Sequence, residues 1–592
     1  MENEKLLKSG EFLVREICPD NVFIPEEYDE EQKMIAQTCK DFLEAEVYPT
    51  VEQVEKSDRE LMKSTLKKSG ELGLMGISIP EELGGFGQSF VTQMLVAEIM
   101  GGGYSFSVAY SAHCGIGTLP IMYYGNEDQR QRYVTKLATG EYLGAYCLTE
   151  PGAGSDANSG KSNAKLSDDG KHYILNGQKM WITNAGFADI LVVFAKIDTD
   201  RVLSAFIVES KYSGVVIGPD EHKMGIKGSS TAQIYFNDVK VPVENLLGKR
   251  GEGFRIALNI LHMGRLKLGS SVIGAAKKAI DDSVKYANER KQFGSLISTF
   301  GSIKHKLAEQ VIRAFAAEAA VYRVSADIDN LMKQMLPVHG DYGKAAIESI
   351  SHYAVEAAIL KVAGSDMLDF VVDEAVQIHG GMGYSAETMV ERGFRDSRIN
   401  KIFEGTNEIN RLLVVDTAMK RAMKGDFDLF GEAEKIWSDL GNITSGKASS
   451  ESYFEEKYRY IKNFKKAILL CIHGANDTFK KTIISEQETL NSIADMMMET
   501  YLSESLAMRV EKLGKTQGDI SLYKDILDVN ISEAANIVRK SAFDAISAFC
   551  TTDSCPVLTK AMDELTKISC VNVKDARRRI ADKLIADNCY KF

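Results

Sequence analysis

The spacing of hydrophobic residues changes twice along this chain, and that order limits the folds open to it. From 30 to about 141, apolar residues recur every three to four positions, as in amphipathic helices. From about 144 to 253, short runs rich in β-branched residues alternate with turn formers, as in a compact β domain. From 254 to about 424 the pattern is helical again and rich in alanine, which suits a bundle of long helices. A doubly wound nucleotide-binding sheet would alternate strand and helix throughout, so this order argues against one.

A chain of 592 residues is too long for a single hydrophobic core, so we expect several domains. The small, polar stretch 441–450 indicates a mobile connection to a last helical region. The expected class is mainly α with a central β domain and an extra all-α domain at the C-terminal end. The expected parts are an N-terminal extension (1–29), a helical domain (30–143), a β domain (144–253), a helix bundle (254–424), a linker (425–453) and an extra helical domain (454–592).

One dipeptide in the β region carries a turn signal. Asn176-Gly177 separates two short runs, Tyr173–Leu175 and Lys179–Thr183. An Asn-Gly pair between such runs is a strong local indication of a hairpin. We therefore predict that the chain reverses direction at Gly177.

Charge and cysteine content exclude several classes of function. The formal net charge is -12, whereas a protein whose main partner is nucleic acid presents a basic surface. The nine cysteines are scattered, and none of their spacings matches a zinc site, which fits a reducing compartment. The start, Met1–Lys5, has neither a signal-peptide core nor an Arg-rich presequence, and no run of about 18 apolar residues occurs. We expect a cytoplasmic protein with no metal site.

Two glycine-containing loops could approach a ligand closely. Tyr146–Asp156 includes Thr-Glu-Pro-Gly-Ala-Gly-Ser-Asp, whose hydroxyl and backbone N–H groups suit an anion or a flat ring. From composition alone, a surface loop of turn formers is the commoner explanation. Gln377–Tyr384 follows a helical stretch, so a helix C-cap is the simpler interpretation of its glycines. The glycines of Gly248–Gly253 lack the spacing of a dinucleotide-binding loop.

Glu404 is a candidate general base. A glutamate is most often a solvated surface charge. Here Ile402 and Phe403 precede it and Gly405 follows, so its carboxylate could lie against apolar surface. Desolvation raises the pKa of a carboxyl group and suits it to take up a proton.

Five stretches, taken together in order and spacing, resemble the acyl-CoA dehydrogenase family. The resemblance covers about 30 to 424 and is greatest to the very-long-chain branch, which also has an extra C-terminal helical domain. It implies an N-terminal helical domain, a middle β-barrel-like domain and a four-helix bundle. The stretches are Tyr146–Asp156, Trp181–Asn184, Glu289–Gly294, Gln377–Gly383 and Phe403–Glu408.

The resemblance implies FAD as cofactor, held between the β domain and the bundle. Two subunits would build each site, so the implied state is a homodimer or larger homo-oligomer. Arg290 and Phe293 would come from the neighbouring subunit, with Gln377 and Gly381, to hold the adenine-side pyrophosphate. The other implied FAD residues are Tyr146, Cys147, Leu148, Thr149, Gly154, Ser155, Trp181, Ile182, Thr183, Thr406 and Glu408.

The resemblance also implies a reaction, the α,β-dehydrogenation of fatty acyl-CoA to trans-2-enoyl-CoA in β-oxidation. Glu404 would remove the α-proton, because the position from which some relatives supply the base is Gly264 here. Hydrogen bonds to the thioester oxygen would stabilise the developing enolate. Electrons would pass to an electron-transferring flavoprotein. The implied substrate-binding residues are Ser155, Met263, Gly264, Arg265 and Gly405.

Departures from the family pattern bear on the substrate. Gly301 stands where medium-chain members have a glutamine that contacts FAD, which puts that contact in doubt. By the resemblance, Val108 and Ala112 take the positions of polar residues that close the medium-chain acyl cavity. Smaller apolar residues would leave a deeper slot, and each buried methylene contributes roughly 0.8 kcal/mol. We therefore expect a preference for long acyl chains.

The C-terminal domain leaves two interpretations open. Its amphipathic stretches, Ile484–Lys512 and Ile531–Phe549, are most simply helices packed on the bundle. Weak attachment to a membrane surface is the alternative, and it would use Lys462, Lys465, Lys466, Lys480 and Lys481. For the whole chain, an acyl-CoA oxidase and a scaffold subunit also remain open. Peroxide production with substrate alone would indicate the oxidase.

Overall fold

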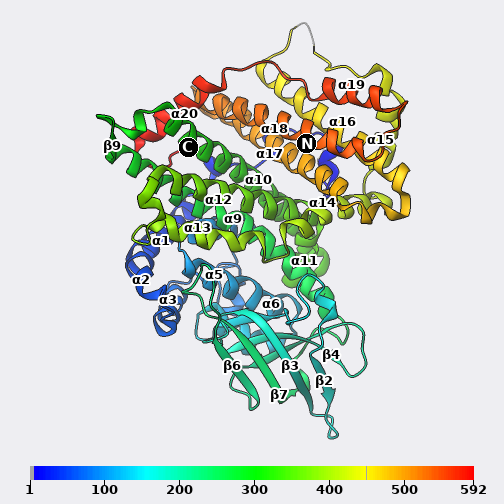
Figure 1. Ribbon diagram of the computed structural model, residues 1–592. Helices are drawn as coiled ribbons and strands as arrows, with labels where there is room; N and C mark the ends of the chain where they lie inside the picture. Colours follow the sequence, from blue (N-terminus) through cyan, green and yellow to red (C-terminus); the bar gives the residue numbers. More distant parts are fainter. Residues whose placement is uncertain (1–5, 448–449) are drawn as a thin grey trace.

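The computed structural model describes residues 6–447 and 450–592 and shows four regions in the expected order (Figure 1). A helical region is followed by a β domain, a bundle of long helices and a further helical domain. The β domain projects from one end of the molecule, and the last helices cover the opposite end. The class expected from the sequence, mainly α with a central β domain, is confirmed.

The first helical region begins at a side-chain cap. The Asp29 side chain accepts a hydrogen bond from the N–H of Gln32, and the Gln32 side-chain oxygen accepts one from the N–H of Asp29, so two end groups of the first helix are satisfied. Ser89 caps the fourth helix in the same way through the N–H of Thr92. The helices are α1 (Glu30–Phe42), α2 (Val51–Val54), α3 (Arg59–Glu71), α4 (Phe90–Met100), α5 (Ser105–Ala112), α6 (Leu119–Tyr124), α7 (Glu127–Gln129) and α8 (Thr135–Ala138).

The β domain is built on one eight-stranded sheet. Its strands run in the order β6-β7-β3-β2-β4-β5-β8, and β1 pairs with β4 in parallel. Side chains on one face, such as Val193 and Phe206, form a separate core within the domain. The strands are β1 (Gly144–Cys147), β2 (Asn163–Leu166), β3 (His172–Thr183), β4 (Ile190–Ile197), β5 (Ser204–Glu209), β6 (Val215–Asp220), β7 (Thr231–Pro242) and β8 (Leu246–Leu247).

The prediction of a hairpin turn at Asn176-Gly177 is wrong. Strand β3 continues through Gly177 and pairs with β7 on either side of an irregularity between Leu175 and Gly177. A Cβ on Gly177 would lie 2.3 Å from the Ser162 hydroxyl oxygen, so the glycine serves a close approach between strands. A glycine inside a strand commonly marks such a place.

The bundle consists of long helices that approach each other closely. A Cβ on Gly364 would lie 2.9 Å from the Val272 side chain and 3.4 Å from the Gly269 Cα, so these glycines bring α9 and α12 together. The elements are α9 (Gly253–Glu289), β9 (Lys291–Gln292), β10 (Ser295–Leu296), α10 (Gly301–His339), α11 (Tyr342–His352), α12 (Ala354–His379), α13 (Met389–Ser397) and α14 (Asn407–Met423).

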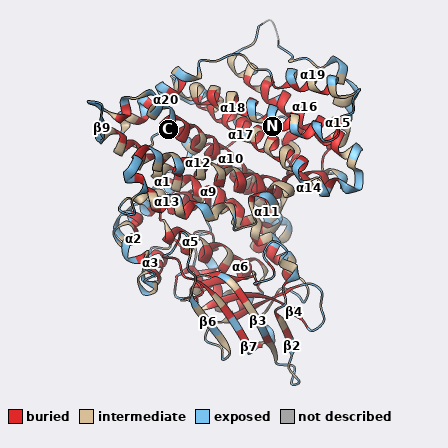
Figure 2. Ribbon diagram, viewed as in Figure 1, coloured by how far each residue is buried: buried red, intermediate tan, exposed pale blue. Residues whose placement is uncertain are grey.

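The last helical domain shares one continuous core with the bundle (Figure 2). The N-terminal segment lies between the two, and the rings of Phe12 and Tyr501 meet at 5.0 Å. The segment expected as a linker contains a helix whose Trp437 ring lies 4.7 Å from that of His473, while its positions 448–449 lie outside the described residues. The helices are α15 (Leu429–Ser438), α16 (Tyr453–Phe479), α17 (Gln487–Thr516), α18 (Ser521–Ser547), α19 (Cys555–Leu565) and α20 (Val573–Asp587).

Buried ion pairs join this domain to the bundle. Arg509 on α17 is 1% exposed, and its guanidinium donates to Glu318 on α10 at 2.6 Å and to Glu26 at 2.8 Å. Lys277 on α9 donates to the same Glu318 and, at 2.6 Å, to Glu98 on α4. Five segments distant in sequence are therefore linked by buried charges, each of which would be left unpaired if its partner were removed.

The lysines considered for membrane attachment do not form one exposed patch. Lys465 is buried and pairs with Glu504, and Lys462 pairs with Glu16 at 2.9 Å. Across the part of the chain that the structure describes, no helix combines the length and the apolar character needed to cross a bilayer.

Candidate active site

Glu404 lies in a short segment with unusual backbone conformation between α13 and α14. Its φ is +58° and that of Gly405 is +87°, and a non-glycine residue with positive φ often marks a functional site. Arg265 from α9 donates to the Glu404 carbonyl oxygen at 3.1 Å, and Asn410 from α14 donates to the Gly405 carbonyl oxygen at 2.8 Å. These bonds fix the turn from both sides.

The carboxylate of Glu404 occupies the space that a side chain at Gly264 would fill. A Cβ on Gly264 would lie 2.4 Å from Oε2 of Glu404 and 2.6 Å from its Cδ. Oε2 is buried and has no hydrogen-bond partner among the described residues, and the backbone N–H of Glu404 meets no acceptor there. Within the described part of the chain, Oε2 of Glu404 is therefore a free hydrogen-bond acceptor, and the backbone N–H of the same residue is a free donor.

Burial raises the pKa of Glu404 to about 7, and the positive charges of Arg265 and Lys361 oppose that rise. Neither cation forms an ion pair with the carboxylate. Arg265 is 4% exposed, and the Lys361 ammonium donates to Asn407 at 2.7 Å. Near neutral pH the carboxyl group can accordingly both take up and release a proton.

A long cavity that opens to solvent begins at Glu404 and runs along α9. Val108 and Ala112 of α5 line it, as do Leu368 and Val372 of α12. The wall on α9 is a single stripe with helical spacing: Gly264, Lys267, Leu268, Ser271, Val272, Ala275, Lys278, Ala279 and Asp282. At 1.5 Å per residue, its ends lie about 27 Å apart.

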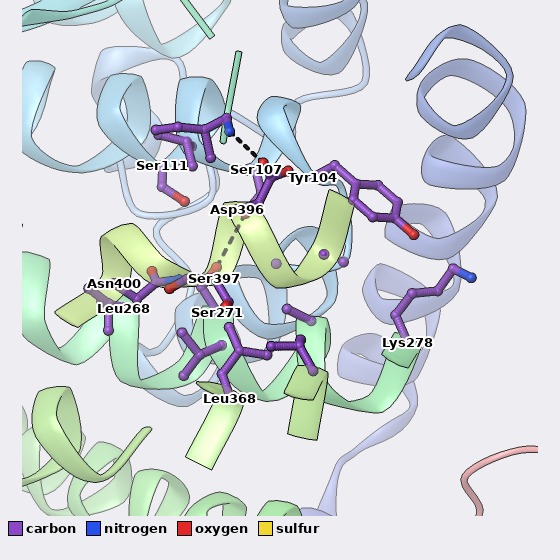
Figure 3. A pocket seen from close by; sticks show the side chains of 18 of the residues that line it. Tyr104, Ser107, Ser111, Leu268, Ser271, Lys278, Leu368, Asp396, Ser397 and Asn400 are labelled. Atoms are coloured by element: carbon purple, nitrogen blue, oxygen red, sulfur yellow. Dashed lines mark hydrogen bonds between the residues drawn. The ribbon is translucent and has the colours of Figure 1, made fainter. Parts of the chain in front are cut away.

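The cavity is not apolar throughout (Figure 3). The hydroxyl groups of Ser107 on α5 and Ser271 on α9 lie 3.3 Å apart along its wall. Tyr104 and Lys278 lie together at one end of the view, and Lys278 pairs with Asp282 at 2.6 Å. The expectation of small apolar residues on α5 is therefore incomplete, because Ser107 and Ser111 line the cavity beside Val108 and Ala112.

The β domain contributes an open surface beside this cavity. Thr183 lines the cavity, and Trp181, with a φ of +60°, is 52% exposed. A Cβ on Gly154 would meet nothing within 4 Å, so the neighbouring loop also borders open space. The side chains of Cys147 and Ile182 instead point into the β-domain core, so these two residues could contact a ligand there only through their backbone.

A second group of candidate residues lies at the ends of α9 and α12. The rings of Tyr286 and His379 stack at 4.1 Å, which holds these two helix ends together; Arg290 follows α9, Gln377 lies at the end of α12 and Gly381 just after it. Phe293, in the β9–β10 hairpin, is 94% exposed. In Figure 1 this hairpin and the β domain lie at separate corners of the molecule.

Comparison with known proteins agrees with this arrangement. Family models for the acyl-CoA dehydrogenase N-terminal domain, middle domain and C-terminal domain match residues 29–141, 145–239 and 251–419, and a further C-terminal-domain model matches 463–563. A probable acyl-CoA dehydrogenase of Bacillus subtilis (strain 168) is 42% identical over 97% of both chains. The chain belongs to the acyl-CoA dehydrogenase family.

Two further relatives extend the comparison. The crystal structure of an acyl-CoA dehydrogenase complexed with FAD from Bacillus anthracis matches with a TM-score of 0.96 and 43% identity, covering 99% of this chain and 100% of that one. The very long-chain specific acyl-CoA dehydrogenase of Rattus norvegicus mitochondria is 40% identical over 81% of this chain and 74% of its own. This protein is an FAD-dependent oxidoreductase of that family.

The residues of this acyl-CoA dehydrogenase fit a flat, partly polar cofactor. The exposed Trp181 ring, the threonine at 183 and the open loop at Gly154 provide a surface on the β domain. Of the expected substrate residues, Gly264 lines the cavity and Arg265 braces Glu404, but Met263 is 1% exposed and packs into the bundle core. The Met263 side chain therefore packs behind the cavity wall and does not line the cavity.

Sequence reasoning missed three residues that line the cavity or lie close to Glu404. Lys361 lies in an alanine-rich helix, and nothing in its neighbourhood distinguishes it from a surface lysine. Asp396 lines the cavity, and burial raises its pKa to about 7. Asn410 could have been found from the sequence, because it lies one helical turn after Thr406, the N-cap of α14. From that position its side chain reaches back to the preceding loop.

Proposed function

We propose that this enzyme dehydrogenates long-chain fatty acyl-CoA between C2 and C3 to give a trans-2-enoyl-CoA, with Glu404 as the base. One observation carries the proposal. The unpartnered Oε2 of Glu404 lies at the head of a cavity long enough for an acyl chain, in the space left by Gly264. Burying a carboxylate oxygen without a hydrogen-bond donor costs free energy. Such a group is therefore a good candidate for the place where a substrate proton is taken up.

The chain's own groups account for proton removal. With its pKa near 7, Glu404 is substantially ionised at neutral pH and can take the weakly acidic α-proton of a thioester. The free N–H of Glu404 can donate to the thioester oxygen and so stabilise the enolate that develops. Arg265 holds the Glu404 carbonyl and keeps this N–H in a fixed orientation. FAD, when bound, supplies the acceptor for the β-hydrogen as hydride.

The cavity length supports a long acyl chain. Carbon–carbon bonds of about 1.5 Å advance an extended chain by roughly 1.3 Å per methylene. The α9 stripe of about 27 Å then accommodates up to roughly 20 carbons. Leu268, Val272 and Ala275 provide its apolar contacts, at roughly 0.8 kcal/mol for each buried methylene.

We further propose that FAD is shared between two copies of the chain, as residues from both would complete each site. The Trp181 surface and the Arg290–Phe293 hairpin lie at separate corners of one chain. A two-fold related copy would bring the hairpin of one subunit to the β domain of the other. An electron-transferring flavoprotein is the proposed electron acceptor.

Anaerobic titration of the holoenzyme with acyl-CoAs from C4 to C18 tests the reaction through bleaching of the flavin absorbance. Glu404→Gln keeps the volume and removes the base, so it should retain FAD and bind substrate without bleaching. Glu499→Gln is a matched control, because burial also raises the pKa of Glu499 to about 7 but this residue lies on α17, away from the cavity. Rapid bleaching by Glu404→Gln would refute the assignment, and a rate maximum at C4 would refute the long-chain preference.

A further inference from the structure

Three consecutive arginines on α20 differ in their partners. Arg577 pairs with Glu309 at 2.6 Å, and Arg579 pairs with Asp525 at 2.6 Å. Arg578, between them, makes no hydrogen bond or ion pair with any residue that the structure describes. A guanidinium carries five donors in a rigid fork and is most useful where an anion can accept two of them.

Arg578 lies against the start of α10, at Gly301. A Cβ on Gly301 would have the Arg578 Nη2 atom at 3.4 Å as its single neighbour within 4 Å. Gly301 directly follows Phe300, whose ring lies 6.2 Å from that of Phe293 in the β9–β10 hairpin. The Arg578 guanidinium, which belongs to the last domain, therefore lies beside the hairpin. It occupies space next to Gly301, where a larger residue would place its side chain.

Contacts on the C-terminal side of Arg578 fix the position of α20. Lys304 of α10 pairs with Asp582, and the Asn288 side chain at the end of α9 donates to Asn588 at 2.9 Å. In Figure 1 the red α20 lies beside the green segment that carries β9. The guanidinium is thus attached to a rigid element and extends toward the hairpin rather than from a loose terminus.

The exposed groups around the hairpin suit a nucleotide diphosphate. Arg290, like Arg578, makes no ion pair with any described residue, and Phe293 presents almost its whole ring to solvent. Two guanidinium groups can each donate two hydrogen bonds to phosphate oxygens, and an exposed aromatic ring can stack on a base.

We propose that Arg578, from the extra C-terminal domain, donates hydrogen bonds to the pyrophosphate of the FAD whose flavin ring is held by a second copy of the chain. The inference rests on the proposed two-subunit cofactor site and adds a residue and a role to it. The last domain then takes part in cofactor binding across the dimer, in addition to covering the bundle.

The test measures FAD release from the purified holoenzyme on dilution, followed by the rise in flavin fluorescence. Arg578→Gln should weaken FAD binding about 10- to 100-fold, as expected for the loss of hydrogen bonds to a charged group. Arg579→Gln is the matched control, because that neighbouring exposed arginine already pairs with Asp525, and it should stay within about twofold of the parent protein. Light scattering and thermal unfolding, recorded with FAD in excess, should give the same dimer and nearly the same Tm for both variants.

Arg290→Gln distinguishes failure of this inference from failure of the proposed site. If Arg290→Gln loses FAD affinity but Arg578→Gln does not, the two-subunit site stands and the role of Arg578 is overturned. If neither variant loses affinity, the proposed placement of FAD at the hairpin fails, and the inference fails with it. A loss of affinity in Arg579→Gln as large as in Arg578→Gln would show a general effect of charge on α20 and would also overturn the specific role.

Discussion

Replacing Gly264 by alanine should displace the proposed base, Glu404, without lowering the stability of the fold. The added Cβ would lie 2.4 Å from Oε2 of Glu404, whereas contacts between such atoms need roughly 3.5 Å, so the carboxylate must retreat by about 1 Å. A displacement of about 1 Å in a catalytic group lowers a rate by roughly 100-fold. The atoms that must move are the end of one side chain, and alanine is favoured over glycine inside a helix by about 1 kcal/mol, so the Tm should not fall.

The assay is stopped-flow reduction of the bound flavin by a saturating long-chain acyl-CoA under anaerobic conditions. Gly115→Ala provides a matched control, because Gly115 also lines the cavity but its added Cβ would meet only Lys267, at an ordinary 3.7 Å. The expected result is a roughly 100-fold slower reduction for Gly264→Ala and little change for Gly115→Ala. Reduction by Gly264→Ala within threefold of the parent rate would show that the position of Glu404 against α9 does not govern proton removal.

Three further predictions follow from the site and its surroundings. Because burial raises the pKa of Glu404 to about 7 and the base must be ionised, kcat/KM should rise with pH up to about 7 and then level; a profile flat from pH 5 to 9 would contradict this. Ala275→Phe, about 16 Å along α9 from Gly264, should raise KM for C16 substrates and leave C8 unchanged, as steady-state rates with both would show. Arg509→Met should lower the free energy of unfolding by about 3–5 kcal/mol in denaturant titrations, because Glu26 and Glu318 lose a buried partner; an unchanged midpoint would refute that estimate.

The order of the domains could be predicted from the sequence, and Glu404 could be selected from it as a candidate base, because both steps depend on local patterns. Hydrophobic period distinguishes helix from strand over long windows, and the segment around Glu404 is contiguous. The contact between Glu404 and Gly264 could not be derived this way, because 140 positions separate the residues and only the packed bundle brings them together.

Two wrong expectations show the limits of local signals. Asn176-Gly177 has the composition of a hairpin turn, but the close approach of Ser162 requires a glycine within a continuous, locally irregular strand. Lys465 is one of the five lysines of the membrane-attachment alternative, which needs it at the surface, yet it lies buried on α16 and pairs with Glu504. In both cases a neighbour distant in sequence determines the conformation, and a single sequence does not identify that neighbour.

The buried ion pairs around Glu318 have a consequence for attempts to shorten this protein. Glu318 lies inside the bundle, yet one of its two cationic partners, Arg509, belongs to the last domain. Cutting the chain after the bundle would leave an acid and an apolar face facing water, and would also remove the packing of the N-terminal segment through Phe12. The segment that follows the bundle, 425–592, is thus not a detachable module, and a shorter derivative would need compensating changes inside the bundle before it could fold.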